Sequence, residues 1–134
     1  IGILAAVGTV AYTGYTAGAK KSAAKSNQSA VTKYIAAELQ KCNLGETKAM
    51  DDNLTCSGRD GAKTVTAAVT ALASFKNPYD TGEKAVQKTK TYSTDGNAGY
   101  TTLTNVSAVI TIGTCIEETC STAANQQTNT VTVE

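Results

Sequence analysis

Residues 1–25 read IGILAAVGTVAYTGYTAGAKKSAAK, an apolar run of small residues that passes directly into a lysine-studded segment. Beyond this stretch, apolar residues continue at three-, four- and seven-residue steps: Ala24, Val31, Tyr34, Ile35, Leu39 and Cys42. This spacing predicts an amphipathic helix. Gly45 stands where the C-cap of that helix is expected. A continuous helix over residues 1–43 would be on the order of 60 Å long, more than one small domain covers, so its first part is expected to protrude.

The start of the helix carries a recognisable string. Gly2–Val7 reads GILAAV, and Tyr12 and Tyr15 follow it. The string resembles the back half of the conserved helix of type IV pilins and pseudopilins, which commonly reads GILAAVAIP followed by two spaced tyrosines. Val10 departs from the family, which usually has proline there. The resemblance also implies missing residues before Ile1, including a methylated N-terminal residue and a glutamate, so we expect a fragment of the mature protein.

In that family the apolar helix is the part of the subunit that polymerises. The resemblance therefore assigns filament packing to the following residues: Ile1, Ile3, Leu4, Val7, Val10, Tyr12 and Tyr15. It further implies that this segment is the end of a membrane span in the precursor, and that the span is followed by the basic cluster of Lys20, Lys21 and Lys25. The alternative reading of the apolar run is the buried end of a core helix, because short apolar runs are ambiguous.

Composition limits the chemistry that this chain can perform. The 134 residues suit one domain, and 12 basic against 11 acidic residues give a net charge of only +1, too small to indicate nucleic-acid binding. A lysine stripe on the helix keeps DNA binding as a secondary possibility, but no specific nucleic-acid partner is predicted. Histidine is absent, which excludes triads built on it. The acidic pairs Asp51–Asp52 and Glu117–Glu118 are adjacent in sequence and do not predict a catalytic dyad. We expect no enzyme activity and no cofactor.

Four cysteines stand in a chain that looks secreted: Cys42, Cys56, Cys115 and Cys120. Oxidation is the natural interpretation, and four cysteines allow three pairings. The local pairs Cys42–Cys56 and Cys115–Cys120 are favoured because each cysteine has a near neighbour. A zinc site fits the spacing poorly, and the acidic residues between 51 and 60 do not follow the spacing of a calcium loop. No metal site is predicted.

The remainder of the chain predicts a β-rich head. Residues 45–61 are polar and turn-rich, and a second helix is predicted over residues 62–75. A hairpin is expected between residues 86–93 and 99–105, turning at Asp95-Gly96. Alternation then predicts strands over residues 106–113 and 130–134. Their inward positions would be Val106, Ala108, Ile110, Ile112, Val131 and Val133.

The predicted fold class is α+β, with a long N-terminal helix (residues 1–43) packed on a three- to four-stranded antiparallel sheet in the head (residues 44–134). The resemblance implies a structural subunit that polymerises through its helix into a homo-oligomeric type IV pilus, for attachment, motility or DNA uptake. Such a fibre would be extracellular, with the inner membrane holding the precursor. The alternatives are a pseudopilin of type II secretion and a monomeric secreted binding domain.

Overall fold

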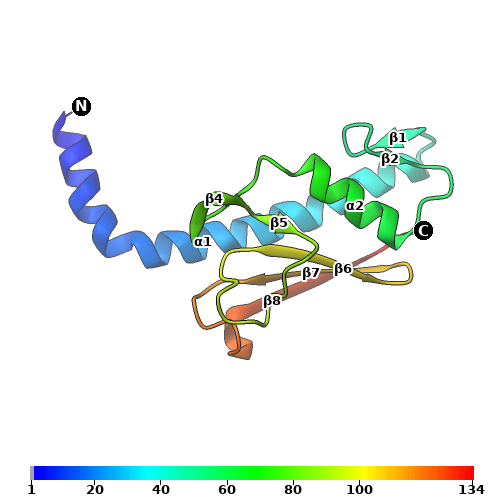
Figure 1. Cartoon of the computed structure of the whole chain (residues 1–134). Coiled ribbons are helices and arrows are strands. Elements are labelled where there is room, and N and C mark those ends of the chain that lie inside the picture. Colours follow the sequence, from blue (N-terminus) through cyan, green and yellow to red (C-terminus); the bar gives the residue numbers. More distant parts are fainter. Residues whose placement is uncertain (1) are drawn as a thin grey trace.

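The computed structural model describes the backbone of residues 2–134 and the side chains of residues 17–134. A long helix, α1 (Gly2–Asn43), leads into a mixed head of one further helix and several small sheets. Figure 1 shows the second part of α1 lying along the head while its N-terminal part leaves the head. The α+β class and the long N-terminal helix are confirmed.

One face of α1 is buried in the head. Its buried residues follow the helical repeat: Ala24, Gln28, Val31, Ile35, Glu38, Leu39 and Cys42. Lys33, on the opposite face, and Lys25, at the flank of the buried face, are exposed. The helix ends where predicted, because Gly45 adopts φ +102°, a conformation that favours glycine. The amide of Glu46 donates to the Lys41 carbonyl and that of Gly45 to the Cys42 carbonyl, which is the Schellman arrangement.

The segment after α1 is more ordered than a polar loop. It forms a small hairpin of β1 (Lys48–Ala49) and β2 (Leu54–Thr55). Met50 and Leu54 are fully or almost fully buried and join the main hydrophobic cluster. The segment is therefore part of the core and not only a surface connection.

Helix α2 (Gly61–Ala71) confirms the second predicted helix, although it ends four residues early. The Asp60 side chain caps it by accepting a hydrogen bond from the Lys63 amide at 2.8 Å. Val65 and Ala68 are buried against the sheet, and α2 lies mainly over β6. After α2, β3 (Lys76–Asn77) pairs with β4 (Asp80–Lys84).

The main sheet has the strand order β5-β6-β7-β8. Three strands, β6 (Thr101–Val106), β7 (Val109–Cys115) and β8 (Gln126–Thr132), are antiparallel neighbours. The fourth, β5 (Val86–Gln87), runs parallel to β6, so the sheet is mixed and not purely antiparallel. Leu103, Ile110 and Ile112 are fully buried in the core that the sheet shares with α1 and α2.

The predicted hairpin around Asp95-Gly96 is wrong. Residues 88–100 form a long connection, and the Asp95 carboxylate accepts from the Ser121 amide at 2.7 Å instead of closing a hairpin. The connection folds back over the sheet, where the Tyr92 ring lies so close to Gly113 that a Cβ there would overlap it. Because β5 is parallel to β6, the chain needs such a crossover between them.

The true hairpin joins β6 to β7 through Ser107 and Ala108, with Ser107 at φ +53°. Val106 is therefore 81% exposed at its end, contrary to the inward position expected for it. Ile110 and Ile112 are inward as predicted, and Val133 is buried just after β8. The last strand begins earlier than expected, at Gln126, and lies at the sheet edge as predicted.

Candidate functional site

The candidate site is the base of the head, which we define as Ala17–Lys21 of α1 together with Tyr79 and the loop of residues 115–120. Ala17, Gly18 and Ala19 are exposed, Lys20 and Lys21 are half-buried, and Ala24 is the first buried residue among the described side chains. The base is thus the place where α1 stops being covered by its own head. An open hollow of about 520 Å³ lies between these elements.

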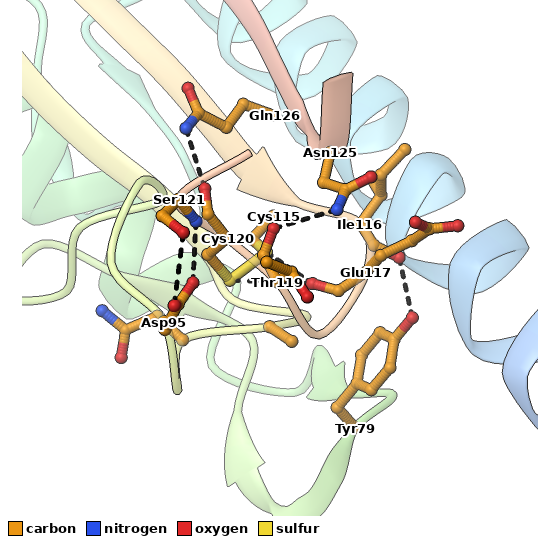
Figure 2. Close-up of a disulfide and its surroundings, with 12 residues drawn as sticks. Tyr79, Asp95, Cys115, Ile116, Glu117, Thr119, Cys120, Ser121, Asn125 and Gln126 are labelled. Atoms are coloured by element: carbon orange, nitrogen blue, oxygen red, sulfur yellow. Dashed lines mark hydrogen bonds between the residues drawn. A yellow bond between two sulfur atoms is a disulfide. The ribbon is translucent and has the colours of Figure 1, made fainter. Parts of the chain in front are cut away.

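Two lysines of α1 connect the helix to the head at the base. The Lys21 Nζ lies 2.7 Å from Glu117 Oε1, and the Lys20 Nζ lies 5.5 Å from the centroid of the Tyr79 ring. Both contacts are partly exposed, so each stabilises the fold weakly and serves mainly to orient the groups. The Tyr79 hydroxyl donates to the Ile116 carbonyl at 2.7 Å (Figure 2). Burial, with the charges of Glu117 and Glu118, raises the pKa of Tyr79.

The loop at the base is held by a disulfide between Cys115 and Cys120, whose Cα atoms lie 5.3 Å apart. Side chains outside the loop satisfy its carbonyl groups, as Figure 2 shows. Asn125 Nδ2 donates to the Thr119 carbonyl at 2.9 Å, and Gln126 Nε2 donates to the Cys120 carbonyl at 2.8 Å. The disulfide and these hydrogen bonds hold the loop in one conformation, which places Glu117 next to α1.

The second disulfide joins Cys42, in the last turn of α1, to Cys56 beyond the β1–β2 hairpin. Arg59 supports the same junction, since its guanidinium donates to the Cys56 carbonyl at 2.9 Å and to Asn43 Oδ1 at 2.7 Å. The two local pairs favoured from the sequence are thus the pairs that the structure forms.

A buried polar network ties the middle of α1 to the sheet, and the sequence pattern did not predict it. Gln28 is 2% exposed, and its amide nitrogen donates to the Ile112 carbonyl at 2.8 Å and to Asn129 Oδ1 at 2.9 Å. Its amide oxygen accepts from the Thr114 hydroxyl at 2.6 Å. In the sequence, the one indication that Gln28 is buried is its position in the apolar pattern of the helix, four residues after Ala24 and three before Val31.

A small charged cluster lies near the other end of α1. Glu38 is buried, and its carboxylate pairs with the Lys41 Nζ at 2.7 Å. Burial, reinforced by the negative charges of Asp51 and Glu38, raises the pKa of the neighbouring Tyr34 to about 12. The hydrogen bond and charge of Glu38 raise the pKa of Lys41 as well.

The acidic pairs from the sequence do not converge on a reaction centre. Glu117 is engaged by Lys21, Glu118 is exposed beside it, and Asp51 and Asp52 lie exposed in the β1–β2 turn. Among the residues that the structure describes, no group of three or more cysteine or acidic side chains could hold a metal ion. An open hollow of about 550 Å³ between β2 and α2 is lined by Asn53, Leu54, alanine and hydroxyl side chains, and a single charged one, Lys63.

The residues expected to pack a filament lie outside the described side chains: Ile1, Ile3, Leu4, Val7, Val10, Tyr12 and Tyr15. Within the described part of the chain, no helix is long and apolar enough to cross a membrane.

Comparison with known proteins adds no relative. No protein-family model matches the chain, and neither the curated proteins nor the solved structures contain a match.

Proposed function

We propose that this chain is a structural subunit that polymerises through α1 into an extracellular fibre of the type IV pilus kind. The observation that carries the proposal is the division of α1. The helix has 42 residues, yet its first buried described side chain is Ala24. At the usual rise per residue the part before Ala24 is about 33 Å long.

The sequence of that part supports the same function. Residues 1–11 contain no charged or strongly polar side chain, and only Thr9 carries a hydroxyl. This apolar start of the helix needs a partner, because soluble proteins rarely expose continuous apolar surface. Identical helices bundled in a fibre core supply that partner, and a repeated heterologous contact that does not close gives an open helical polymer. Before assembly, the inner membrane would shelter the same surface.

The head is built to hold its shape at both ends of the covered part of α1. The Cys42–Cys56 disulfide fixes the far end, and the Cys115–Cys120 loop meets α1 through Lys21 at the base. Disulfides persist in oxidising compartments, in keeping with a fibre outside the cell. The proposal therefore gives the head a structural and surface-presenting role.

Replacing Leu4 and Val7 with Asp tests the proposal. Burying two carboxylates in an apolar fibre core costs more than about 3 kcal/mol per subunit, so the fibre yield should fall more than about a hundredfold. Electron microscopy and sedimentation of material sheared from the cell surface measure the yield. Circular dichroism and peptide mapping without reduction check that the head is folded.

The matched control places the same two charges on the exposed head positions Ser57 and Ser93. This Ser57→Asp, Ser93→Asp variant should assemble like the parent. Unchanged fibre yield in the Leu4→Asp, Val7→Asp variant would disprove polymerisation through α1.

A further inference from the structure

Strand β8 forms one edge of the main sheet, and among the residues that the structure describes it pairs only with β7. Two bonds outside the strand fix which backbone groups face β7: the Val133 amide donates to the Ala108 carbonyl, and the Ile116 amide donates to the Asn125 carbonyl, each at 2.8 Å. Hydrogen-bonded pairs alternate along an antiparallel ladder, so the odd-numbered residues of β8 bond to β7. The even-numbered residues Thr128, Thr130 and Thr132 direct their amides and carbonyls away from the sheet.

These outward groups are open to solvent. Thr128, Thr130 and Thr132 are all exposed, and within the described part of the chain no hydrogen bond is made by their backbone groups outside the sheet. In Figure 1, β8 lies at the side of the sheet opposite β5. The edge therefore offers three neighbouring positions for pairing with another strand.

The two edges of the sheet are protected to different degrees. Strand β5 has two residues, is flanked by Lys84 and Lys88, and ends in the long connection to β6. Shortness and lysines are the usual means of blocking an edge. Strand β8 has seven residues, and no charged residue or proline occurs between Ser121 and Val133. Threonine and valine favour extended structure, so β8 has the features of a strand that accepts a partner.

We propose that β8 pairs with β8 of a second copy of this chain, antiparallel and about a two-fold axis through Thr130. The three outward positions are symmetric about that residue. A two-fold axis there places Thr130 opposite Thr130 and Thr128 opposite Thr132, and each pair exchanges two backbone hydrogen bonds. Two four-stranded sheets become one continuous sheet.

The side chains favour an identical strand as the partner. The threonines of β8 lie on the sheet face away from α1, and cross-strand threonine pairs stabilise a sheet. Glu134, the first charged residue after β8, would face the uncharged Gln126 of the other copy. No like charges therefore meet between the two paired strands.

This contact does not depend on the proposed fibre. A two-fold contact is closed and joins two copies only. Between soluble chains it gives a dimer. Between fibres, in which all subunits point the same way, it joins subunits of two antiparallel fibres and produces lateral bundles.

Cysteine cross-linking tests the register. In the full chain with its native disulfides intact, Thr130→Cys should be joined to itself by a short thiol-specific cross-linker, because the two Cβ atoms would lie about 5 Å apart. Thr104→Cys is the matched control. Thr104 is an exposed threonine in the same cross-strand row, two strands away from the edge. Its two copies would lie about 24 Å apart, beyond the reach of the reagent.

The expected result is a covalent dimer on a reducing gel for Thr130→Cys, with a 130–130 link by mass spectrometry, and a monomer for Thr104→Cys. Equal cross-linking of the two variants, or none at position 130, would overturn the proposal. Cross-linking of position 130 to a different protein would overturn it also, in favour of a foreign strand. The dimer should persist when Thr130→Cys is combined with Leu4→Asp and Val7→Asp, which separates this contact from fibre assembly.

A proline at position 130 provides a second measurement. The Thr130 amide faces away from β7, so Thr130→Pro removes an outward donor and leaves the ladder to β7 in place. In the Leu4→Asp, Val7→Asp background, which prevents fibre assembly, sedimentation of this variant should show the monomer at concentrations where the same chain with Thr130 is dimeric. A dimer that survives Thr130→Pro would argue against pairing through β8.

Discussion

Replacing Gln28 with alanine should destabilise the head more than any other change to a polar residue on α1 outside the disulfide. Gln28 is 2% exposed and makes three hydrogen bonds, to the Ile112 carbonyl, to Asn129 and from Thr114. A buried hydrogen bond contributes about 1 kcal/mol net, and a buried group left without a partner costs about 1–3 kcal/mol. Thr114 keeps a contact with the Thr101 hydroxyl at 3.3 Å, and Asn129 is exposed and can bind water.

Because these two groups keep other partners, we count only the three lost hydrogen bonds, which amount to about 3 kcal/mol of unfolding free energy. For a chain of this size that corresponds to a fall in melting temperature of about 10 °C. Urea unfolding of the disulfide-intact chain, followed by circular dichroism, measures the free energy by linear extrapolation. Gln28→Glu should be at least as destabilising, because a carboxylate cannot donate to the Ile112 carbonyl.

The matched control is Gln40→Ala, an exposed glutamine of the same helix whose one recorded side-chain contact, with Asn43, is 3.5 Å long. Its unfolding free energy should change by less than about 0.5 kcal/mol. The reasoning is refuted if Gln28→Ala and Gln40→Ala cost the same, because the network would then contribute nothing to the junction of helix and sheet.

Two further perturbations concern alkaline pH and the disulfides. The pKa of Tyr34 is raised to about 12, above the ordinary value of 10.0, so the folded state favours the neutral phenol. The contribution of the neutral Tyr34 side chain to the free energy of unfolding is complete below pH 10 and is lost as pH rises toward 12. The melting temperature of Tyr34→Phe should therefore fall less steeply with pH over this interval than that of the parent chain. Identical slopes of melting temperature against pH would show that Tyr34 is not responsible. Replacing Cys42 and Cys56 with serine should cost about 3 kcal/mol, and replacing Cys115 and Cys120 about 2 kcal/mol, by loop-closure entropy. Denaturant titration that ranks the short loop above the long one would contradict this explanation.

The helices could be predicted because each repeats an apolar pattern over several turns. The end of α1 also has a clear signal, Gly45, whereas α2 ends at Ala71, four residues before the predicted end. The strand containing Ile110 and Ile112 was likewise visible from alternation. In all of these segments, local pattern and tertiary burial agree, which is the condition under which local rules succeed.

The hairpin around Asp95 could not be predicted correctly, because contacts distant in sequence decide it. Asp-Gly favours a two-residue turn locally, but Asp95 binds Ser121, and Asn77 donates to the Ala98 carbonyl at 3.0 Å. Gln28 escaped prediction for a related reason. A glutamine within an apolar stripe is usually exposed, and only the carbonyl of Ile112, far along the chain, makes its burial favourable.

At the base of the head the sequence predicted the Cys115–Cys120 loop but not its neighbours. Nothing local indicates that Lys21 meets Glu117, or that Tyr79 reaches the Ile116 carbonyl, since each contact joins segments more than thirty residues apart. Such pairs follow from the path of the whole chain over the sheet.

The lengthwise packing of α1 along the sheet (Figure 1) determines how the head responds to tension. A pull along the axis of the packed part of α1 loads the contacts between helix and sheet in shear. The Gln28 bonds and the apolar stripe then resist together, and they do not open one after another as in a zipper. Should they yield, the Cys42–Cys56 bond still transmits the force covalently to the β1–β2 hairpin, so the helix cannot be drawn out of the head by breaking noncovalent contacts alone.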